Sequence, residues 1–225
     1  MSLVDARAGT WVVVAAYNEE AAIAAVVGDL ARAGWNVVVV DDGSHDDTAS
    51  SASTAGAIVL RHAINRGQGA ALQTGIDFAL ARGAKRLVTF DADGQHDAGD
   101  LPALIAALDD ADVALGSRFL GSIVGASRRR RAFLRAATTV SNRLAGLPLT
   151  DAHCGLRAFR AEVATHLRMT QDRMAHASEL LANLRRSGAR WVEVPVTVRY
   201  TEHSARKGQH GLQAVRVLFD YWFRS

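Results

Sequence analysis

Short runs of β-branched residues alternate with alanine-rich stretches through the first half of the chain, and this alternation limits the possible folds more than any other feature. The predicted strands are 11–15, 36–40, 57–60, 86–90 and 112–115, and the predicted helices are 19–33, 46–55, 67–81 and 101–108. The strand segments are continuously apolar rather than alternating, which is typical of a parallel sheet covered by helices on both faces. The pattern therefore predicts an α/β fold with a mostly parallel central sheet.

The second half is less regular. We expect strands at 158–160 and 190–198 and helices at 128–144, 174–186 and 211–223, the last of them amphipathic and rich in large apolar side chains. Neither an internal repeat nor a low-complexity linker divides the 225 residues. A single domain over residues 1–225, with halves 1–116 and 117–225, is the expectation.

Composition excludes several classes of protein. One cysteine, Cys154, rules out an internal disulfide and fits a reducing compartment. Asp5 and Arg7 interrupt any secretion signal, and the apolar run at 11–17 is far shorter than the ~20 residues of a membrane span. The arginine run 128–131 lacks the interleaved aromatic residues of a nucleic-acid binder, so we expect no nucleic-acid partner.

Polar residues follow four of the predicted strands. They are Tyr17-Asn18-Glu19, Asp41-Asp42, Asp91-Ala92-Asp93 and Ser117-Arg118. Ligands of open parallel sheets bind beyond the carboxyl ends of the strands, where these residues should meet. The sequence thus predicts one acidic site with an arginine nearby.

Asp91 and Asp93 are the strongest candidates for a metal site, because carboxylate oxygens suit Mg²⁺ or Mn²⁺. A plain turn at Asp93-Gly94 is the competing interpretation. The segment Gly67-Gln68-Gly69 lacks the third glycine of a dinucleotide-binding loop and follows the third strand rather than the first. A dinucleotide fold is therefore not predicted.

Four motifs together resemble the family 2 glycosyltransferases with the GT-A fold, in their dolichyl- or polyprenyl-phosphate mannosyl/glucosyltransferase branch. The motifs are Ala16-Tyr17-Asn18-Glu19-Glu20, Val40-Asp41-Asp42-Gly43-Ser44, Asn65-Arg66-Gly67-Gln68-Gly69 and Asp91-Ala92-Asp93-Gly94-Gln95-His96. Downstream segments at 149–159, 194–196 and 207–209 extend the resemblance over residues 11–222. It implies transfer of a hexose from a nucleotide-diphosphate sugar, UDP-glucose or GDP-mannose in type, with residues 1–116 binding the donor and 117–225 serving the acceptor.

The resemblance also implies roles for single residues. The metal (Mg²⁺ or Mn²⁺) would be held by Asp91, Asp93 and Gln95; the donor by Ala15, Tyr17, Glu19, Asp41, Asp42, Gln68, Asp91 and Arg206; and the catalytic residues would be Asp93, Arg118, Lys207 and Glu179. Asp151 matches an acidic position near the sugar. Glu179 fits a solvated helix position nearly as well as a catalytic one. Ala15 and Gln68 depart from the proline and lysine usual in the family, which blurs the identity of the nucleotide.

A lipid phosphate acceptor would explain why arginines cluster in the helix predicted at 128–144. Arg131 and Arg135 lie one helical turn apart and can face one phosphate, with a hydroxyl from Thr138 or Thr139 beside them. An ionised phosphate needs no strong general base, and the resemblance implies inversion at the anomeric carbon.

The expected partners are a nucleotide-diphosphate sugar, a polyprenyl-phosphate lipid, and a membrane surface or small membrane protein. The expected location is the cytoplasm, with peripheral attachment to the membrane. Two alternatives stay open: a glycosyltransferase acting on a sugar hydroxyl in polysaccharide synthesis, and a non-catalytic nucleotide-sugar-binding partner of a membrane protein.

Overall fold

The computed structural model describes residues 7–166 and 176–200. In chain order the strands are β1 (Thr10–Ala16), β2 (Asn36–Asp41), β3 (Ile58–Arg61), β4 (Arg86–Asp91), β5 (Val113–Val124), β6 (Arg157–Arg160) and β7 (Trp191–Arg199). The helices are α2 (Glu20–Arg32), α3 (Thr48–Thr54), α4 (Gln68–Ala81), α5 (Leu101–Ala107), α6 (Arg128–Ala145), α7 (Ala161–Ala164) and α8 (His176–Ser187), with a 3₁₀ turn at Ala98–Asp100.

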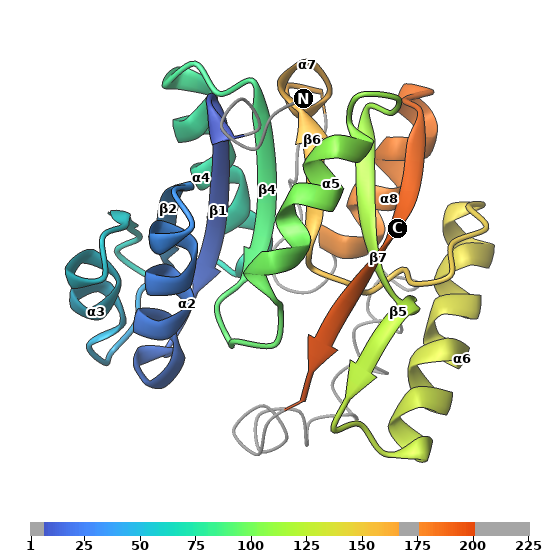
Figure 1. Cartoon of the computed structure of the whole chain (residues 1–225), viewed down its shortest axis with the longest axis horizontal. Coiled ribbons are helices and arrows are strands. Elements are labelled where there is room, and N and C mark those ends of the chain that lie inside the picture. The colour runs from blue at the N-terminus through green and yellow to red at the C-terminus, as the bar shows by residue number, and fades with distance from the viewer. Residues whose placement is uncertain (1–6, 167–175, 201–225) are drawn as a thin grey trace.

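The seven strands form one sheet in the order β3-β2-β1-β4-β6-β5-β7 (Figure 1). All neighbouring pairs are parallel except those of β6, which runs antiparallel to both β4 and β5. This confirms the predicted α/β fold with a mostly parallel sheet.

Helices cover both faces of the sheet (Figure 1). On one face, Ile23 and Leu30 of α2 and Leu104 of α5 pack on Val12 and Val88 in one buried cluster. The other face carries a second buried cluster, whose helical members include Leu72 and Ile76 of α4, Ala145 of α6, and Leu180, Leu181 and Leu184 of α8. Burial on both faces explains why the strands are continuously apolar.

One predicted element needs correction, and one helix was not predicted. The strand predicted to end at residue 115 continues to Val124, because it pairs with β7 beyond an irregularity between Ser117 and Ser122. The short α7 was not predicted. The helix expected at 211–223, and the first residues of the one expected at 174–186, lie outside the described residues.

Among residues 7–166 and 176–200, no helix is both long enough and apolar enough to span a membrane.

Candidate functional site

The carboxyl ends of β1, β2 and β4 lie side by side, as their sequence pattern predicts. Ala15 is in register with Asp91 of β4, and Ala16 is in register with Asp41 of β2. The loop after β4 therefore begins beside the end of β1, with the end of β2 one strand further along the sheet (Figure 1). Asp91 and Asp93 enter the site from this loop.

Hydrogen bonds within the loop hold the Asp93 carboxylate. The backbone N–H of Gln95 donates to Oδ1 of Asp93 at 3.0 Å, and the side-chain amide of Gln95 donates to Oδ2 at 2.6 Å. Burial and the charge of Asp91 raise the pKa of Asp93 to about 6, with Glu19 adding to the effect. Two carboxylates whose negative charges repel each other in a partly buried site favour the binding of a cation.

Asp91 is positioned by residues from three other parts of the chain. His96 Nε2 lies 2.8 Å from Asp91 Oδ2, and the amide of Gln68, at the start of α4, donates to Oδ1 at 3.3 Å. A Cβ on Gly155 would lie 2.3 Å from Oδ2 and 2.4 Å from Oδ1, so the backbone at Gly155 closes directly on the carboxylate. Thr89 fixes this contact because its hydroxyl donates to the Gly155 carbonyl at 2.7 Å.

The end of β7 anchors the same loop from the other half of the chain. The N–H of Arg199 donates to the carbonyl of Gln95 at 2.8 Å, and the Arg199 guanidinium pairs with Asp97 at 2.8 Å. The N–H of Thr197 donates to Asp100 at 2.7 Å. The loop carrying Asp93 and Gln95 is thus held at both its ends.

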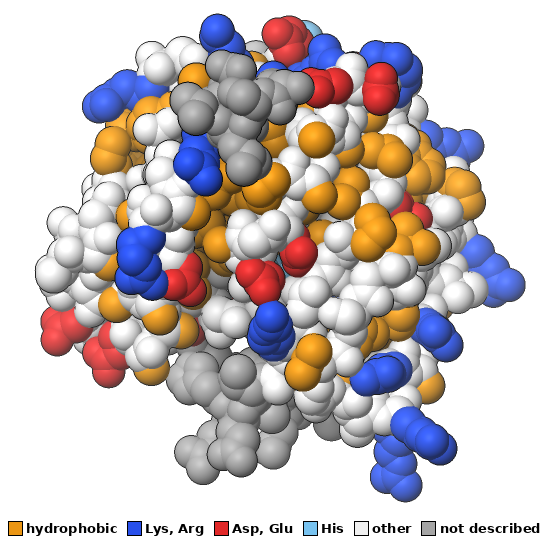
Figure 2. Space-filling view, viewed as in Figure 1, with side chains coloured by type: hydrophobic (Ala, Val, Ile, Leu, Met, Phe, Trp, Pro, Cys, Tyr) orange, Lys and Arg blue, Asp and Glu red, His pale blue; other side chains and the backbone are white. Residues whose placement is uncertain are grey.

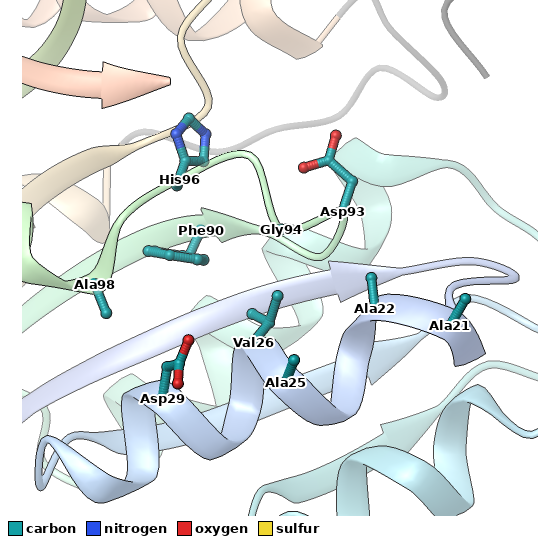
Figure 3. A pocket seen from close by; sticks show the side chains of 10 residues that line it. All are labelled: Ala21, Ala22, Ala25, Val26, Asp29, Phe90, Asp93, Gly94, His96 and Ala98. Atoms are coloured by element: carbon teal, nitrogen blue, oxygen red, sulfur yellow. The ribbon is translucent and has the colours of Figure 1, made fainter. Parts of the chain in front are cut away.

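A hollow of about 370 Å³ lies between α2 and the loop after β4; Asp93 is among the residues that line it, and its carboxylate points away from α2 (Figure 3). Small side chains of α2, Ala21, Ala22 and Ala25, leave the space open opposite Phe90 and His96. Its size lies within the usual range of roughly 300–1,000 Å³ for ligand pockets.

The donor set fits Mg²⁺ or Mn²⁺. Asp91, Asp93 and Gln95 offer oxygen ligands, and every carboxylate oxygen of the pair keeps a lone pair beyond its hydrogen bond. Within the described residues, no three or more His, Cys, Asp or Glu side chains are grouped to hold a metal. Mg²⁺ commonly binds through one or two carboxylates and completes its shell with water and phosphate oxygens, which is the kind of site this pair can form.

Asp41 and Asp42 have partners within the protein. Asp41 is fully buried, accepts from the N–H of Ser44 and pairs with Arg61 at 3.1 Å. Asp42 accepts from the N–H groups of Arg66 and Gly67 and lies 2.7 Å from His62. Both carboxylates therefore shape the loops around the strand ends, and their contact with a nucleotide stays a prediction.

Among the other expected donor residues, the structure places Ala15 at the end of β1. Tyr17 is exposed and Glu19 half-buried directly after that strand. Glu19 donates its backbone N–H to Thr48 at 2.8 Å. Their contacts with a donor also stay predictions.

Arg118 is held in a buried network with two acceptors. Its Nε donates to Asp151 at 2.5 Å, and its Nη1 donates to the hydroxyl of Tyr200 at 2.6 Å. Burial opposes the charged form, but Asp151, Cys154 and Tyr200 together outweigh it, so the pKa of Arg118 is raised. Arg118 is a permanent, fixed cation.

Aromatic rings join this network to the start of α6. The guanidinium of Arg130 lies 4.4 Å from the ring centre of Tyr200, and that of Arg135 lies 5.2 Å from the ring centre of Phe119. Arg131 is exposed and donates to the carbonyl of Ile123 at 2.9 Å. Arginines of α6 thus contact Phe119, which follows Arg118 in the chain, and Tyr200, whose hydroxyl accepts a hydrogen bond from Arg118.

Thr138 lies seven residues after Arg131 and three after Arg135, on the same side of α6. It is 5% exposed, and its hydroxyl accepts from the N–H of Ala152 at 3.4 Å. Thr138 is thus more buried than Arg131 and Arg135, and its contact with an acceptor phosphate stays a prediction.

Glu179 lies in the first turn of α8, next to the buried Leu180 and Leu181, and its catalytic role stays a prediction. Arg206 and Lys207 lie outside the described residues. His96, Gly155 and Tyr200 were not assigned roles from the sequence, although His96 and Gly155 stand inside quoted motifs. The structure shows that His96 and Gly155 contact Asp91 and that Tyr200 contacts Arg118, so these residues position the two side chains.

Comparison with known proteins identifies the family. The model of "Glycosyl transferase family 2" matches residues 11–168. An uncharacterised protein of Methanocaldococcus jannaschii is 36% identical over 216 residues, covering 93% of this chain and 89% of its own. The polyprenol monophosphomannose synthase of Mycolicibacterium smegmatis is 32% identical over 212 residues, covering 88% and 80%.

Among solved structures, glucosyl-3-phosphoglycerate synthase of Mycobacterium tuberculosis, bound to Mn²⁺, UDP-glucose and phosphoglyceric acid, superposes with a TM-score of 0.70. It is 20% identical and covers 98% of this chain and 83% of that one, so it supports the expected GT-A fold alone. The matched segment contains β1, the β4 loop and the start of α6, where the site residues lie. The chain belongs to glycosyl transferase family 2.

Proposed function

We propose that this protein transfers a hexose from a nucleotide-diphosphate sugar to a polyprenyl phosphate, with inversion at the anomeric carbon. The observation that carries the proposal is the Asp91–Asp93 pair at the joined strand ends, where burial and mutual repulsion raise the pKa of Asp93 to about 6. Such a pair favours a divalent cation bound to a diphosphate. A related synthase named for polyprenol monophosphomannose supports the lipid acceptor.

Asp91, Asp93 and Gln95 would hold Mg²⁺ or Mn²⁺, and the cation would offset the charge that develops on the departing diphosphate. His96, Gln68 and Gly155 fix Asp91, while Gln95 fixes Asp93, so the two carboxylates are set before the donor arrives. Preorganised groups of this kind lower the cost of reaching the transition state.

The acceptor side uses cations rather than a base. Arg118 is held by Asp151 and Tyr200, and Arg130 and Arg135 stack on neighbouring rings. An anionic acceptor oxygen is nucleophilic without losing a proton, so a cluster that attracts and aligns a phosphate suffices. Arg131 and Arg135 remain our candidates for phosphate contact, and the proposal places the enzyme at the cytoplasmic face of a membrane.

The test is transfer of radiolabelled sugar to undecaprenyl or dolichyl phosphate, with UDP-glucose and GDP-mannose in parallel. We expect label in the lipid fraction with Mn²⁺ or Mg²⁺ and none with a chelator. Asp93→Asn should lose at least a hundredfold in kcat, whereas Asp77→Asn, which changes an exposed carboxylate on α4, should not.

Other outcomes select the alternatives. Label in a polysaccharide but not in lipid would replace the phosphate acceptor with a sugar hydroxyl. Donor binding without transfer to either acceptor would indicate a non-catalytic nucleotide-sugar-binding partner. Product with retained anomeric configuration would contradict the inverting mechanism.

A further inference from the structure

Strand β6 begins between the two strands that carry the site residues Asp91 and Arg118. Its first residue, Arg157, is in register with Thr89 of β4 and with Leu115 of β5. Asp91 lies two residues after Thr89, and Arg118 lies three residues after Leu115. Because β6 runs antiparallel to both strands, the loop that leads into it lies on the side where Asp91 and Arg118 are.

This loop, residues 151–156, contacts both of these side chains. Near its end, the backbone at Gly155 closes on the Asp91 carboxylate. At its start, Oδ2 of Asp151 accepts from the backbone N–H of Arg118 at 3.1 Å and from the Nε of the same residue. One short segment of backbone thus contacts the proposed metal site and the proposed acceptor site.

The guanidinium of Arg157 holds the middle of the loop. Its Nε donates to the carbonyl of Cys154 at 2.9 Å, and its Nη2 donates to the carbonyl of Ala152 at 3.1 Å. The planar guanidinium fixes both carbonyls relative to each other because its donors have a rigid geometry. Ala152 directly follows Asp151, and Cys154 directly precedes Gly155. The backbone is therefore held next to each of the two contacts.

Arg157 is a costly residue with which to hold two carbonyls, because it is buried. Most Lys and Arg side chains lie on the surface, as they do on the face shown in Figure 2, but Arg157 is 7% exposed. Among residues 7–166 and 176–200, it forms no ion pair with a carboxylate. Burial lowers the pKa of Arg157, while the nearby Cys154, Asp91 and Asp151 act in the opposite direction. A carboxylate from each side of the site thus favours the buried cation.

We propose that Arg157 is a positioning residue that sets Asp91 and Arg118 at the same time, through the loop between them. It touches neither substrate and acts through the backbone that it holds. Such positioning serves group transfer because the leaving group and the attacking group must be aligned, and a displacement of about 1 Å can lower a rate by 10²-fold. The benefit to transfer rests on the proposed function, whereas the hold on the two side chains is independent of it.

The variant R157K tests the proposal, because lysine keeps a cation in the interior but lacks the rigid pair of donors. Two measurements that need no sugar transfer follow the two sides of the site. Calorimetry gives the affinity for Mn²⁺, and the NMR signal of the Arg118 Nε–H, assigned by its absence in R118K, reports on the other side. We expect Mn²⁺ binding to weaken by roughly tenfold or more, as for other residues that orient metal ligands. The Arg118 signal should shift or broaden in the same variant.

Arg160 offers a matched control on the same strand. Its guanidinium also donates to backbone carbonyls, those of Leu108, Asp109 and Ala111, but these follow α5 and lie outside the site. R160K should lower the stability to urea, as R157K does, and should leave both the Mn²⁺ affinity and the Arg118 signal unchanged.

Two further variants each release one end of the loop. T89V removes the hydroxyl that donates to the Gly155 carbonyl at 2.7 Å, so it should weaken Mn²⁺ binding and leave the Arg118 signal in place. E193A removes the carboxylate that accepts from the backbone N–H of Asp151 at 3.1 Å, so it should change the Arg118 signal and leave Mn²⁺ binding as it is. Only a change at Arg157 should alter both.

A folded R157K that changes one measurement alone, or neither, would overturn the proposal, and so would an equal effect of R160K. If circular dichroism shows that R157K does not fold, R157Q, which buries no charge, takes its place, and both measurements should again change together. The transfer assay reports separately on the proposed function. If R157K changes both measurements but the wild type transfers no sugar to lipid phosphate, the positioning role stands and the acceptor is rejected.

Discussion

Position 155 must be glycine because any side chain there meets the Asp91 carboxylate. A Cβ would come within 2.3 Å of Asp91 Oδ2, and the Gly155 carbonyl is already fixed by the hydroxyl of Thr89. Since the backbone cannot retreat, the substitution Gly155→Ala should turn the Asp91 carboxylate away from Asp93. We expect weaker Mn²⁺ binding by calorimetry and at least a tenfold lower kcat/KM, which corresponds to about 1.4 kcal/mol or more.

Gly28→Ala is the matched control, because a methyl group there meets only the flexible end of Arg32. It should leave both Mn²⁺ binding and kcat/KM unchanged. Normal Mn²⁺ affinity in Gly155→Ala would show that Asp91 does not need its present position.

The pKa of Asp93 predicts a pH dependence for the metal-free protein. Burial and Asp91 raise this pKa from 3.8 to about 6, so the folded chain keeps a proton that the unfolded chain releases between those values. The stability from the protonated form is fully present below pH 3.8 and is lost as the pH rises through 6. With a chelator present, Asp93→Asn should therefore have a higher thermal midpoint than the wild type at pH 8, and an equal one near pH 4.

Thermal unfolding of both proteins across this pH range makes the measurement. Mn²⁺ added at pH 8 should raise the midpoint of the wild type more than that of Asp93→Asn. A midpoint difference that is the same at pH 4 and pH 8 would mean that the charge on Asp93 is not the cause.

At the scale of elements, the paired ends of β5 and β7 depend on Gly121. A Cβ at this position would lie 2.2 Å from the carbonyl oxygen and 2.5 Å from the nitrogen of Val196, both of them backbone atoms. Gly121→Ala should therefore force the strands apart and cost about 1–3 kcal/mol of unfolding free energy. Ser122→Ala, which removes only the 3.0 Å hydroxyl contact with Thr197, should cost about 1 kcal/mol or less; urea denaturation of both variants makes the comparison.

The same pair of strands shows which parts of a strand cannot be predicted from the sequence. Runs such as Trp11–Val14 and Val37–Val40 reveal strands because their side chains alone carry the pattern. Residues 116–122 have no continuous apolar run, since only Phe119 and Leu120 are large and apolar, and β5 resumes its pairing with β7 at Ser122 after an irregularity. Neither the antiparallel insertion of β6 nor the four-residue α7 leaves a comparable periodic signal.

The site residues also divide into those whose meeting the sequence predicts and those whose contacts it does not predict. Asp91, Asp93 and Gln95 are close in sequence, so their spacing after a strand predicts their meeting. Gly155 reaches Asp91 across 64 positions and Tyr200 reaches Arg118 across 82, so local patterns cannot predict these contacts. Helical spacing places Thr138 on the same side of α6 as Arg131 and Arg135, but it does not tell that Thr138 is buried.

At the scale of the molecule, the predicted halves 1–116 and 117–225 should unfold together. Strand β6 of the second half lies between β4 and β5, and one buried cluster contains Val12 and Val88 together with Leu156 and Val194. Thermal unfolding should give a single transition, with circular dichroism and tryptophan fluorescence coinciding. Trp11 and Trp35 report on the first half and Trp191 on the second, so single-tryptophan variants that unfold at different temperatures would contradict this prediction.

The position of β6 also sets a delay during synthesis on the ribosome. Strand β4 is complete at Asp91, but the edge that β6 will occupy stays open until residues 157–160 have been made. At about 5–20 residues per second, that wait lasts roughly 3–13 s. During this time the nascent chain exposes an apolar strand edge, which is a template for wrong pairing with other chains. A cell making this protein must shield that edge, so its yield should depend on how fast the middle of the message is translated and on the chaperones that meet it there.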